Sequence, residues 1–87
     1  MSWTLQFTKR ALKDAKKLQA AGLWRRTSEL LDILKNNPFQ NPPPYEKLSG
    51  ELAGAYSRRI NIQHRLVYQP RENEKIVRVL QMWTHYE

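Results

Sequence analysis

The chain has 87 residues, enough for one domain with a modest hydrophobic core and too few for two such domains. It contains no cysteine, which excludes a disulfide framework and is typical of a reducing compartment. The 15 lysines and arginines exceed the 8 aspartates and glutamates, and the net charge of +7 favours nucleic acid as a partner over a membrane surface or an acidic protein.

The N-terminal part of the chain predicts a strand followed by a helix. Residues 3–7 alternate apolar and polar side chains, as in a strand with one buried face. Thr8 is placed to cap the helix that follows, and Gly22 to end it. Three apolar side chains recur on this helix at three-residue spacing: Leu12, Ala15 and Leu18.

A second helix and a proline-rich connector come next. The helix is expected from about Leu23 to Lys35, with Pro38 beyond its end because proline cannot continue a helical hydrogen-bond ladder. Its inward residues are expected to be Leu30, Leu31, Ile33 and Leu34. The stretch from Pro38 to Ala53 is near the length of about 12–15 residues above which a structureless loop indicates a function, and it contains Glu46.

The rest of the chain predicts three strands. Residues 56–60 and 64–69 flank a tight hairpin at 61–63, residues 70–74 form a turn, and residues 75–83 are the longest strand. The order β-α-α-β-β-β predicts one α+β domain over residues 1–87, with a helical hairpin packed on one face of a mainly antiparallel sheet.

The hairpin brings two arginines together. If it is centred on Ile62, Arg59 lies opposite Arg65, and facing like charges destabilise a sheet unless a negative group lies between them. A phosphate suits that place, because a guanidinium offers two parallel donors. Alternatively, both arginines point into solvent, and a register slip of one residue would separate them. His64 and Arg58 fall on the other side of the hairpin and are expected to be structural.

The end of the chain holds a second candidate. His85 follows the last strand, and an imidazole suits proton transfer near neutral pH. Trp83 offers an apolar anchor and a surface on which an unpaired base can stack. The alternative is a frayed tail without a role, and the residues alone leave both interpretations open.

Four blocks of the sequence together carry a family resemblance: YEKL (45–48), LAGAYSRRI (52–60), HRLVY (64–68) and the closing His85-Tyr86. Over nearly its whole length the chain resembles the Txe/YoeB family of bacterial addiction-module toxins, within the RelE superfamily. The resemblance implies a RelE-like, microbial-ribonuclease-like fold and ribosome-dependent cleavage of messenger RNA that inhibits translation. It also implies neutralisation by a small antitoxin of the YefM/Axe type, whose disordered tail wraps the toxin.

The resemblance assigns roles to individual residues. Glu46 matches the general base, Arg65 the phosphate-binding arginine, His85 the general acid and Tyr86 the C-terminal aromatic residue of the family, while Arg59 matches a basic residue of the same cleft.

Two further residues, Lys47 and Trp83, are candidate RNA contacts. The chain departs from many relatives at Ser49, where they carry a lysine, and at Glu87, which extends beyond the terminal tyrosine. Ser49 leaves it open whether the cleft has a positive charge at that position. Glu87 adds a carboxylate near the expected acid.

The expected activity is that of an endoribonuclease without metal or cofactor. A base takes the proton of a 2′-hydroxyl, an acid protonates the leaving 5′-oxygen, and arginines stabilise the phosphate. The product is a 2′,3′-cyclic phosphate that then opens to a 3′-phosphate. The alternatives are a non-catalytic RNA- or ribosome-binding module and a gyrase-inhibiting toxin of the ParE type.

The expected partners are the 70S ribosome with its messenger RNA and the antitoxin, and a homodimer stays open for the free toxin. The sequence has no apolar run near the roughly 20 residues that cross a bilayer and no signal-peptide pattern, so we expect a cytoplasmic protein.

Overall fold

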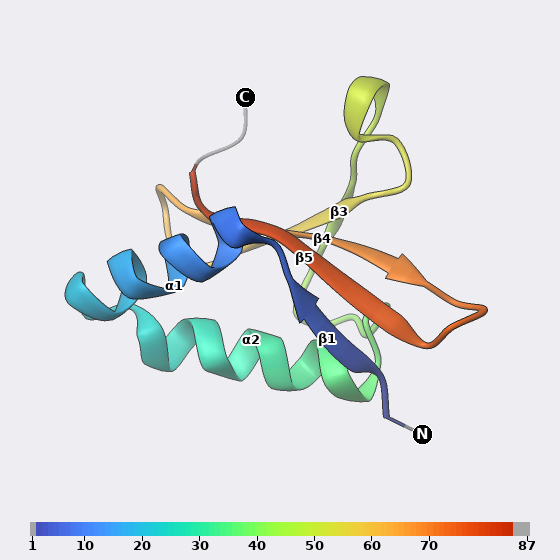
Figure 1. Ribbon diagram of the computed structural model, residues 1–87, viewed down its shortest axis with the longest axis horizontal. Helices are drawn as coiled ribbons and strands as arrows, with labels where there is room; N and C mark the ends of the chain where they lie inside the picture. Colours follow the sequence, from blue (N-terminus) through green and yellow to red (C-terminus); the bar gives the residue numbers. More distant parts are fainter. Residues whose placement is uncertain (1, 85–87) are drawn as a thin grey trace.

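The structure, a computed structural model, describes residues 2–84 and confirms the α+β class. In chain order its elements are β1 (Thr4–Phe7), α1 (Lys9–Ala20), α2 (Trp24–Asn36), β2 (Glu46–Lys47), the 3₁₀ turn η1 (Gly50–Leu52), β3 (Tyr56–Arg59), β4 (Arg65–Arg71) and β5 (Ile76–Thr84). In Figure 1, α1 and α2 lie together on one side of the strands, while η1 stands away from both helices.

The five described strands form one sheet in the order β1-β5-β4-β3-β2. Strand β1 is parallel to β5, and the other neighbouring pairs are antiparallel. A parallel pair needs a long crossover connection, and the helical hairpin begins that connection after β1. The sheet has one strand more than the sequence predicted, because Glu46 and Lys47 pair with β3 and form a short edge strand where a loop was expected.

The ends of α1 follow the prediction. The Oγ1 of Thr8 accepts a hydrogen bond from the amide of Ala11 at 3.0 Å and caps the helix. Gly22 has a φ of 76°, which favours glycine directly beyond a helix end. Helix α2 begins and ends one residue later than expected, at Trp24 and Asn36.

The buried face of α1 differs from the prediction. Leu12 is 55% exposed, whereas Ala11, Asp14 and Leu18 are buried. A helical face repeats at i, i+3, i+4 and i+7, so the buried stripe is 11, 14 and 18, with Ala15 partly buried beside it. The sequence pattern missed this stripe because one of its members is the charged Asp14.

The main core lies between the helices and one face of the sheet. Leu18, Leu30 and Leu34 of the helices pack against buried sheet residues. These sheet residues are Leu66, Tyr68, Val77, Val79 and Met82. On the opposite face a smaller cluster forms around Leu48, Ala55 and Val67, covered in part by Leu52 and Leu80. The second face therefore stays partly open, and the candidate site lies on it.

The predicted register of the hairpin is confirmed. Tyr56 pairs with Tyr68 and Arg59 pairs with Arg65. The turn expected at 70–74 begins later, because β4 extends to Arg71. Pro70 is accepted in this strand because β3 no longer accompanies β4 there and the proline lies at an edge.

Candidate functional site

An open cavity of about 390 Å³ and a neighbouring one of about 330 Å³ lie at the proline connector and the β3–β4 hairpin. The second is called the arginine cleft and is lined by Pro44, Tyr45, Glu46, Ser57, Arg59 and Arg65. Glu46 pairs with Ser57 across β2 and β3, and Arg59 pairs with Arg65 across β3 and β4. Alternation along the strands turns these side chains to the sheet face that the helices leave uncovered.

Glu46 and Arg65 contact each other in the arginine cleft. The Nη1 of Arg65 donates a hydrogen bond to Oε1 of Glu46 and lies 3.5 Å from the Oγ of Ser57. The side chain of Arg65 is 21% exposed and that of Glu46 is 65% exposed, so the pair is accessible from solvent. Glu46 thus supplies a negative partner for Arg65 in the free protein.

Ser57 is a cleft residue that the sequence reasoning missed. It is buried, with 1% of its surface exposed, and its hydroxyl faces the guanidinium of Arg65. The signal was available, since Ser57 and Arg59 are two apart on one strand and therefore share a face.

Arg58 lies inside the protein, on the other side of β3, as predicted. Its guanidinium donates to four oxygens, three of which are backbone carbonyls of the proline connector. The acceptors are the carbonyls of Pro38 (2.9 Å), Gln40 (2.8 Å) and Pro43 (2.6 Å) and the hydroxyl of Tyr68 (3.1 Å). A buried cation is stable only when its donors are satisfied, so this network fixes the connector to the sheet.

The same network perturbs Tyr68. Its hydroxyl donates to the carbonyl of Pro38 at 3.1 Å and accepts from Arg58. Burial raises the pKa of Tyr68 to about 12, and the nearby Arg58 offsets part of this rise. The ring of Tyr45 covers the Arg58 guanidinium at 4.9 Å, so the connector is held up to the residue that precedes Glu46.

The structure separates Trp83 from the arginine cleft. Its ring stacks on His64 with 4.0 Å between centroids and 20° between planes, and Lys17 of α1 lies 6.0 Å from it. Trp83 also packs against the main core, on the helix side of the sheet. His64 is therefore packed, as predicted. Its buried Nδ1 has no hydrogen-bond partner within residues 2–84.

Lys47 lies next to the cleft. It is exposed and lines a hollow of about 240 Å³ together with Glu46 and Arg65. Ser49 lines the same hollow and leaves it without a positive charge at that position.

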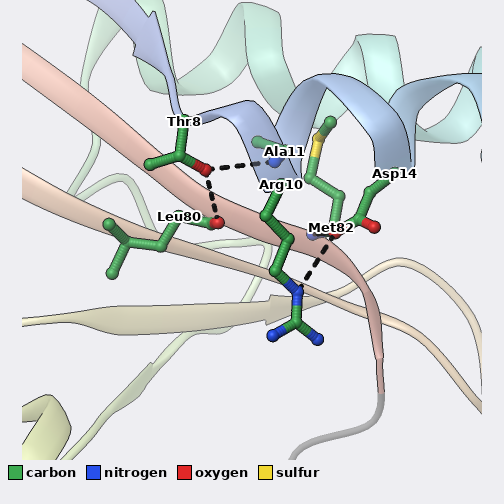
Figure 2. A network of polar contacts seen from close by, with 6 residues as sticks. All are labelled: Thr8, Arg10, Ala11, Asp14, Leu80 and Met82. Carbon is green, nitrogen blue, oxygen red and sulfur yellow. Dashed lines mark hydrogen bonds and ion pairs between the residues drawn. The ribbon is translucent and has the colours of Figure 1, made fainter.

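The end of β5 is held by side chains of α1 and its cap (Figure 2). Strand β1 accompanies β5 only as far as Val79, so the outer edge of β5 has no strand neighbour beyond it. There, Oγ1 of Thr8 donates to the carbonyl of Leu80 at 2.8 Å, and Oδ2 of Asp14 accepts from the amide of Met82 at 2.9 Å. Nε of Arg10 lies 3.9 Å from the same carboxylate oxygen.

Strand β5 ends beside the arginine cleft, because Thr84 pairs with Arg65. His85, Tyr86 and Glu87 lie outside the described residues. Among residues 2–84, no three His, Cys, Asp or Glu side chains are grouped to hold a metal ion. No helix in that range is long and apolar enough to cross a membrane.

Comparisons with known proteins identify the family. Residues 7–86 match the model of the YoeB-like toxin of bacterial type II toxin-antitoxin systems. Toxin YoeB of Mycobacterium bovis is 40% identical over 62 residues, which are 71% of this chain and 71% of that protein.

Two solved structures are similar over almost the whole chain. A YoeB/ParE toxin from Agrobacterium tumefaciens has a TM-score of 0.86 and 30% identity, covering 95% of this chain and 99% of that one. The toxin in a heterotetrameric YoeB-YefM complex from Staphylococcus aureus has a TM-score of 0.80 and 30% identity, covering 99% and 100%. The fold, the cleft and these matches lead to one conclusion: the chain belongs to the family of YoeB-like toxins of bacterial type II toxin-antitoxin systems.

Proposed function

We propose that this toxin is an endoribonuclease that cleaves messenger RNA in the ribosome by attack of a 2′-hydroxyl, without a metal ion. The observation that carries the proposal is the direct contact of Glu46 with Arg65 in an open cleft, at the point where the last strand ends. A carboxylate and a guanidinium side by side are the pair needed to remove a proton and to hold the phosphate next to it.

In the proposed first step, Glu46 takes the proton of the 2′-hydroxyl. The 2′-oxygen forms a bond to phosphorus, the bond from phosphorus to the 5′-oxygen breaks, and the product is a 2′,3′-cyclic phosphate. Water then opens this ring to a 3′-phosphate. Such general base catalysis typically contributes a factor of about 10²–10⁴ to the rate.

His85 is the proposed acid that protonates the leaving 5′-oxygen, and Tyr86 is proposed to act with it. The support is covalent continuity, because His85 follows Thr84, whose backbone pairs with that of Arg65. An imidazole has the chemistry that this step requires.

Arg65 and Arg59 are proposed to bind the scissile phosphate. Negative charge increases on the phosphate as the fifth bond forms, and guanidinium donors directed at its oxygens stabilise that charge. Arg65 must first leave Glu46, because the two are paired in the free protein. Substrate binding therefore frees the base as it occupies the arginine. Lys47 is a proposed contact to the flanking RNA backbone. Trp83, stacked on His64 on the helix side of the sheet, is left out of the proposed site.

The ribosome is the proposed host because the cleft alone holds little of the substrate. Glu46 is 65% exposed, so the cleft does not enclose the nucleotide that it would act on. Alignment of the 2′-oxygen with the breaking bond is worth roughly 7–11 kcal/mol in favourable cases. A ribosome that holds the messenger in a bent form would supply this alignment.

An antitoxin is the proposed partner in the resting cell. A similar toxin from Staphylococcus aureus is found in a complex with YefM, and the net charge of +7 here suits an acidic, flexible protein segment. Covering the arginine cleft with such a segment would keep RNA away from Glu46.

The test is to map the 3′ ends of a defined messenger after incubation with ribosomes and with purified toxin that has been dialysed against a chelator beforehand. We expect new 2′,3′-cyclic phosphate ends with wild type and none with Arg65→Ala. Binding without new ends would indicate a non-catalytic RNA-binding module. Loss of DNA supercoiling activity of gyrase in a parallel assay would indicate a toxin of the ParE type.

A further inference from the structure

The larger of the two cavities, of about 390 Å³, has no role in the mechanism above. It adjoins the arginine cleft and shares Pro44 and Arg59 with it. Its other walls come from the start of α2, where Arg26 lies, and from the tip of the β3–β4 hairpin, where Ile62 lies. A chain that leaves the arginine cleft past Arg59 therefore enters this cavity.

The lining combines apolar walls with positive charge. Leu30, Pro43 and Ile62 are among the apolar lining residues, and Arg26 and Arg59 are exposed. No aspartate or glutamate belongs to the lining. Ile62 is 89% exposed, so its side chain is accessible to a ligand at the rim. Apolar faces with guanidinium groups at the rim bind a flat aromatic group that carries a neighbouring negative charge.

Two hydrogen-bond networks hold the walls in place. The Arg58 guanidinium donates to the carbonyl of Pro43 at 2.6 Å and fixes the connector wall. At the hairpin tip, Oδ1 of Asn61 accepts from the amides of Gln63 at 2.9 Å and His64 at 2.7 Å, which fixes the turn that presents Ile62. The cavity is thus formed before any ligand arrives, and little ordering is required on binding.

We propose that this cavity is a nucleotide subsite, which takes the base of the RNA nucleotide adjacent to the cleavage position while Arg26 faces its phosphate. The inference rests on the proposed ribonuclease function and extends it by adding a second contact along the RNA strand. RNA is favoured over a peptide because the cavity continues from the cleft past Arg59, the charged residue common to both.

The chain provides a matched control for the test. Arg25 and Arg26 are neighbours on α2 and both are exposed, but only Arg26 lines the cavity. Arg25 is 94% exposed and makes one pair with Glu29 at 4.0 Å. Arg25→Ala and Arg26→Ala therefore remove the same charge from the same helix.

The experiment titrates each variant with a 2′-deoxy trinucleotide, which cannot be cleaved through a 2′-hydroxyl, and follows binding by NMR. We expect Arg26→Ala and Ile62→Ser to weaken trinucleotide binding about fivefold or more, and Arg25→Ala to leave it within twofold. A nucleoside 3′-phosphate, which fills the arginine cleft alone, should bind all three variants like wild type.

Equal weakening by Arg25→Ala and Arg26→Ala would show an effect of net charge and overturn the subsite. Loss of antitoxin binding without loss of trinucleotide binding would overturn it in favour of a protein interface. Failure of the proposed function is a separate result: Arg65→Ala would then bind the nucleoside 3′-phosphate as well as wild type does.

Discussion

Glu46 and Arg65 are paired across the arginine cleft in the free protein, so the proposed base and the proposed phosphate ligand neutralise each other until RNA arrives. The two residues come from β2 and β4, which are joined only through β3 between them. One substitution can therefore have opposite effects on binding and on catalysis.

Glu46→Gln removes the carboxylate that competes with the phosphate for Arg65. We expect cleavage to fall by about 10²–10⁴ because the base is lost. Binding of a 2′-deoxy oligonucleotide should instead become several-fold tighter, because Arg65 is released and one negative charge is removed. Single-turnover cleavage and equilibrium binding measure the two effects.

Glu51→Gln is the matched control for this variant, since Glu51 is also exposed and lies in the adjacent turn η1. The same gain in binding from Glu51→Gln would attribute it to net charge. Weaker binding by Glu46→Gln would contradict the competition between carboxylate and phosphate.

His85→Ala should abolish cleavage and toxicity while the fold and antitoxin binding remain. If His85 protonates the leaving oxygen, a substrate with sulfur at the bridging 5′ position should restore cleavage, because a thiolate leaves without a proton. Comparing oxygen and sulfur substrates with wild type and variant tests this. An unchanged deficit with the sulfur substrate would rule out the acid role and leave one in positioning or binding.

Asp14→Ala should loosen the end of β5. The amide of Met82 then loses its acceptor, and a buried donor without a partner costs about 1–3 kcal/mol. We expect a lower free energy of unfolding and faster hydrogen exchange at Met82. Asp14→Asn should restore part of the stability and part of the protection from exchange, because its amide oxygen can still accept the hydrogen bond. Asp32→Ala, at an exposed position of α2, serves as the control and should change neither.

Deprotonation of Tyr68 should lower the free energy of unfolding at alkaline pH. Its pKa is raised from 10 to about 12, so the folded chain keeps a phenol proton that the unfolded chain releases. The stabilisation that results from this pKa difference is on the order of 3 kcal/mol. It is fully present below pH 10 and is lost as the pH rises through about 12.

Phenolate absorbance measures the same property directly. Of the 4 tyrosines, Tyr68 should titrate late in the folded protein and near the usual pH in denaturant. Tyr68→Phe should lack this late component, and its persistence would assign the shift to another tyrosine.

The sequence predicted the features that depend on residues close together in the chain. The hairpin register follows from alternation on both sides of residues 61–63, and Thr8 caps α1 through an amide three residues away. Three of the four acceptors of Arg58 are backbone carbonyls, whose positions residue types do not reveal. The role of Asp14 depends on contact with a residue 68 positions later in the chain, so the spacing of apolar residues along the helix did not indicate it.

In the candidate site, too, local patterns were predicted and long-range contacts were not. Strand alternation was enough to bring Arg59 and Arg65 together, and it would also have found Ser57. The contact of Glu46 with Arg65 depends on a strand of two residues, too short for a periodic pattern. The roles of Glu46, His85 and Tyr86 came from family resemblance.

The bonds from Thr8 and Asp14 to β5 also determine where an extended partner can bind. They occupy the carbonyl of Leu80 and the amide of Met82, so this stretch of β5 is closed to strand addition. Among residues 2–84 the remaining edges are short: β1 and β2 have 4 and 2 residues, and β3 and β4 lack an outer neighbour only over their last residues, which is too little to template a long ladder. A partner that wraps this toxin must therefore recognise it mainly through side chains.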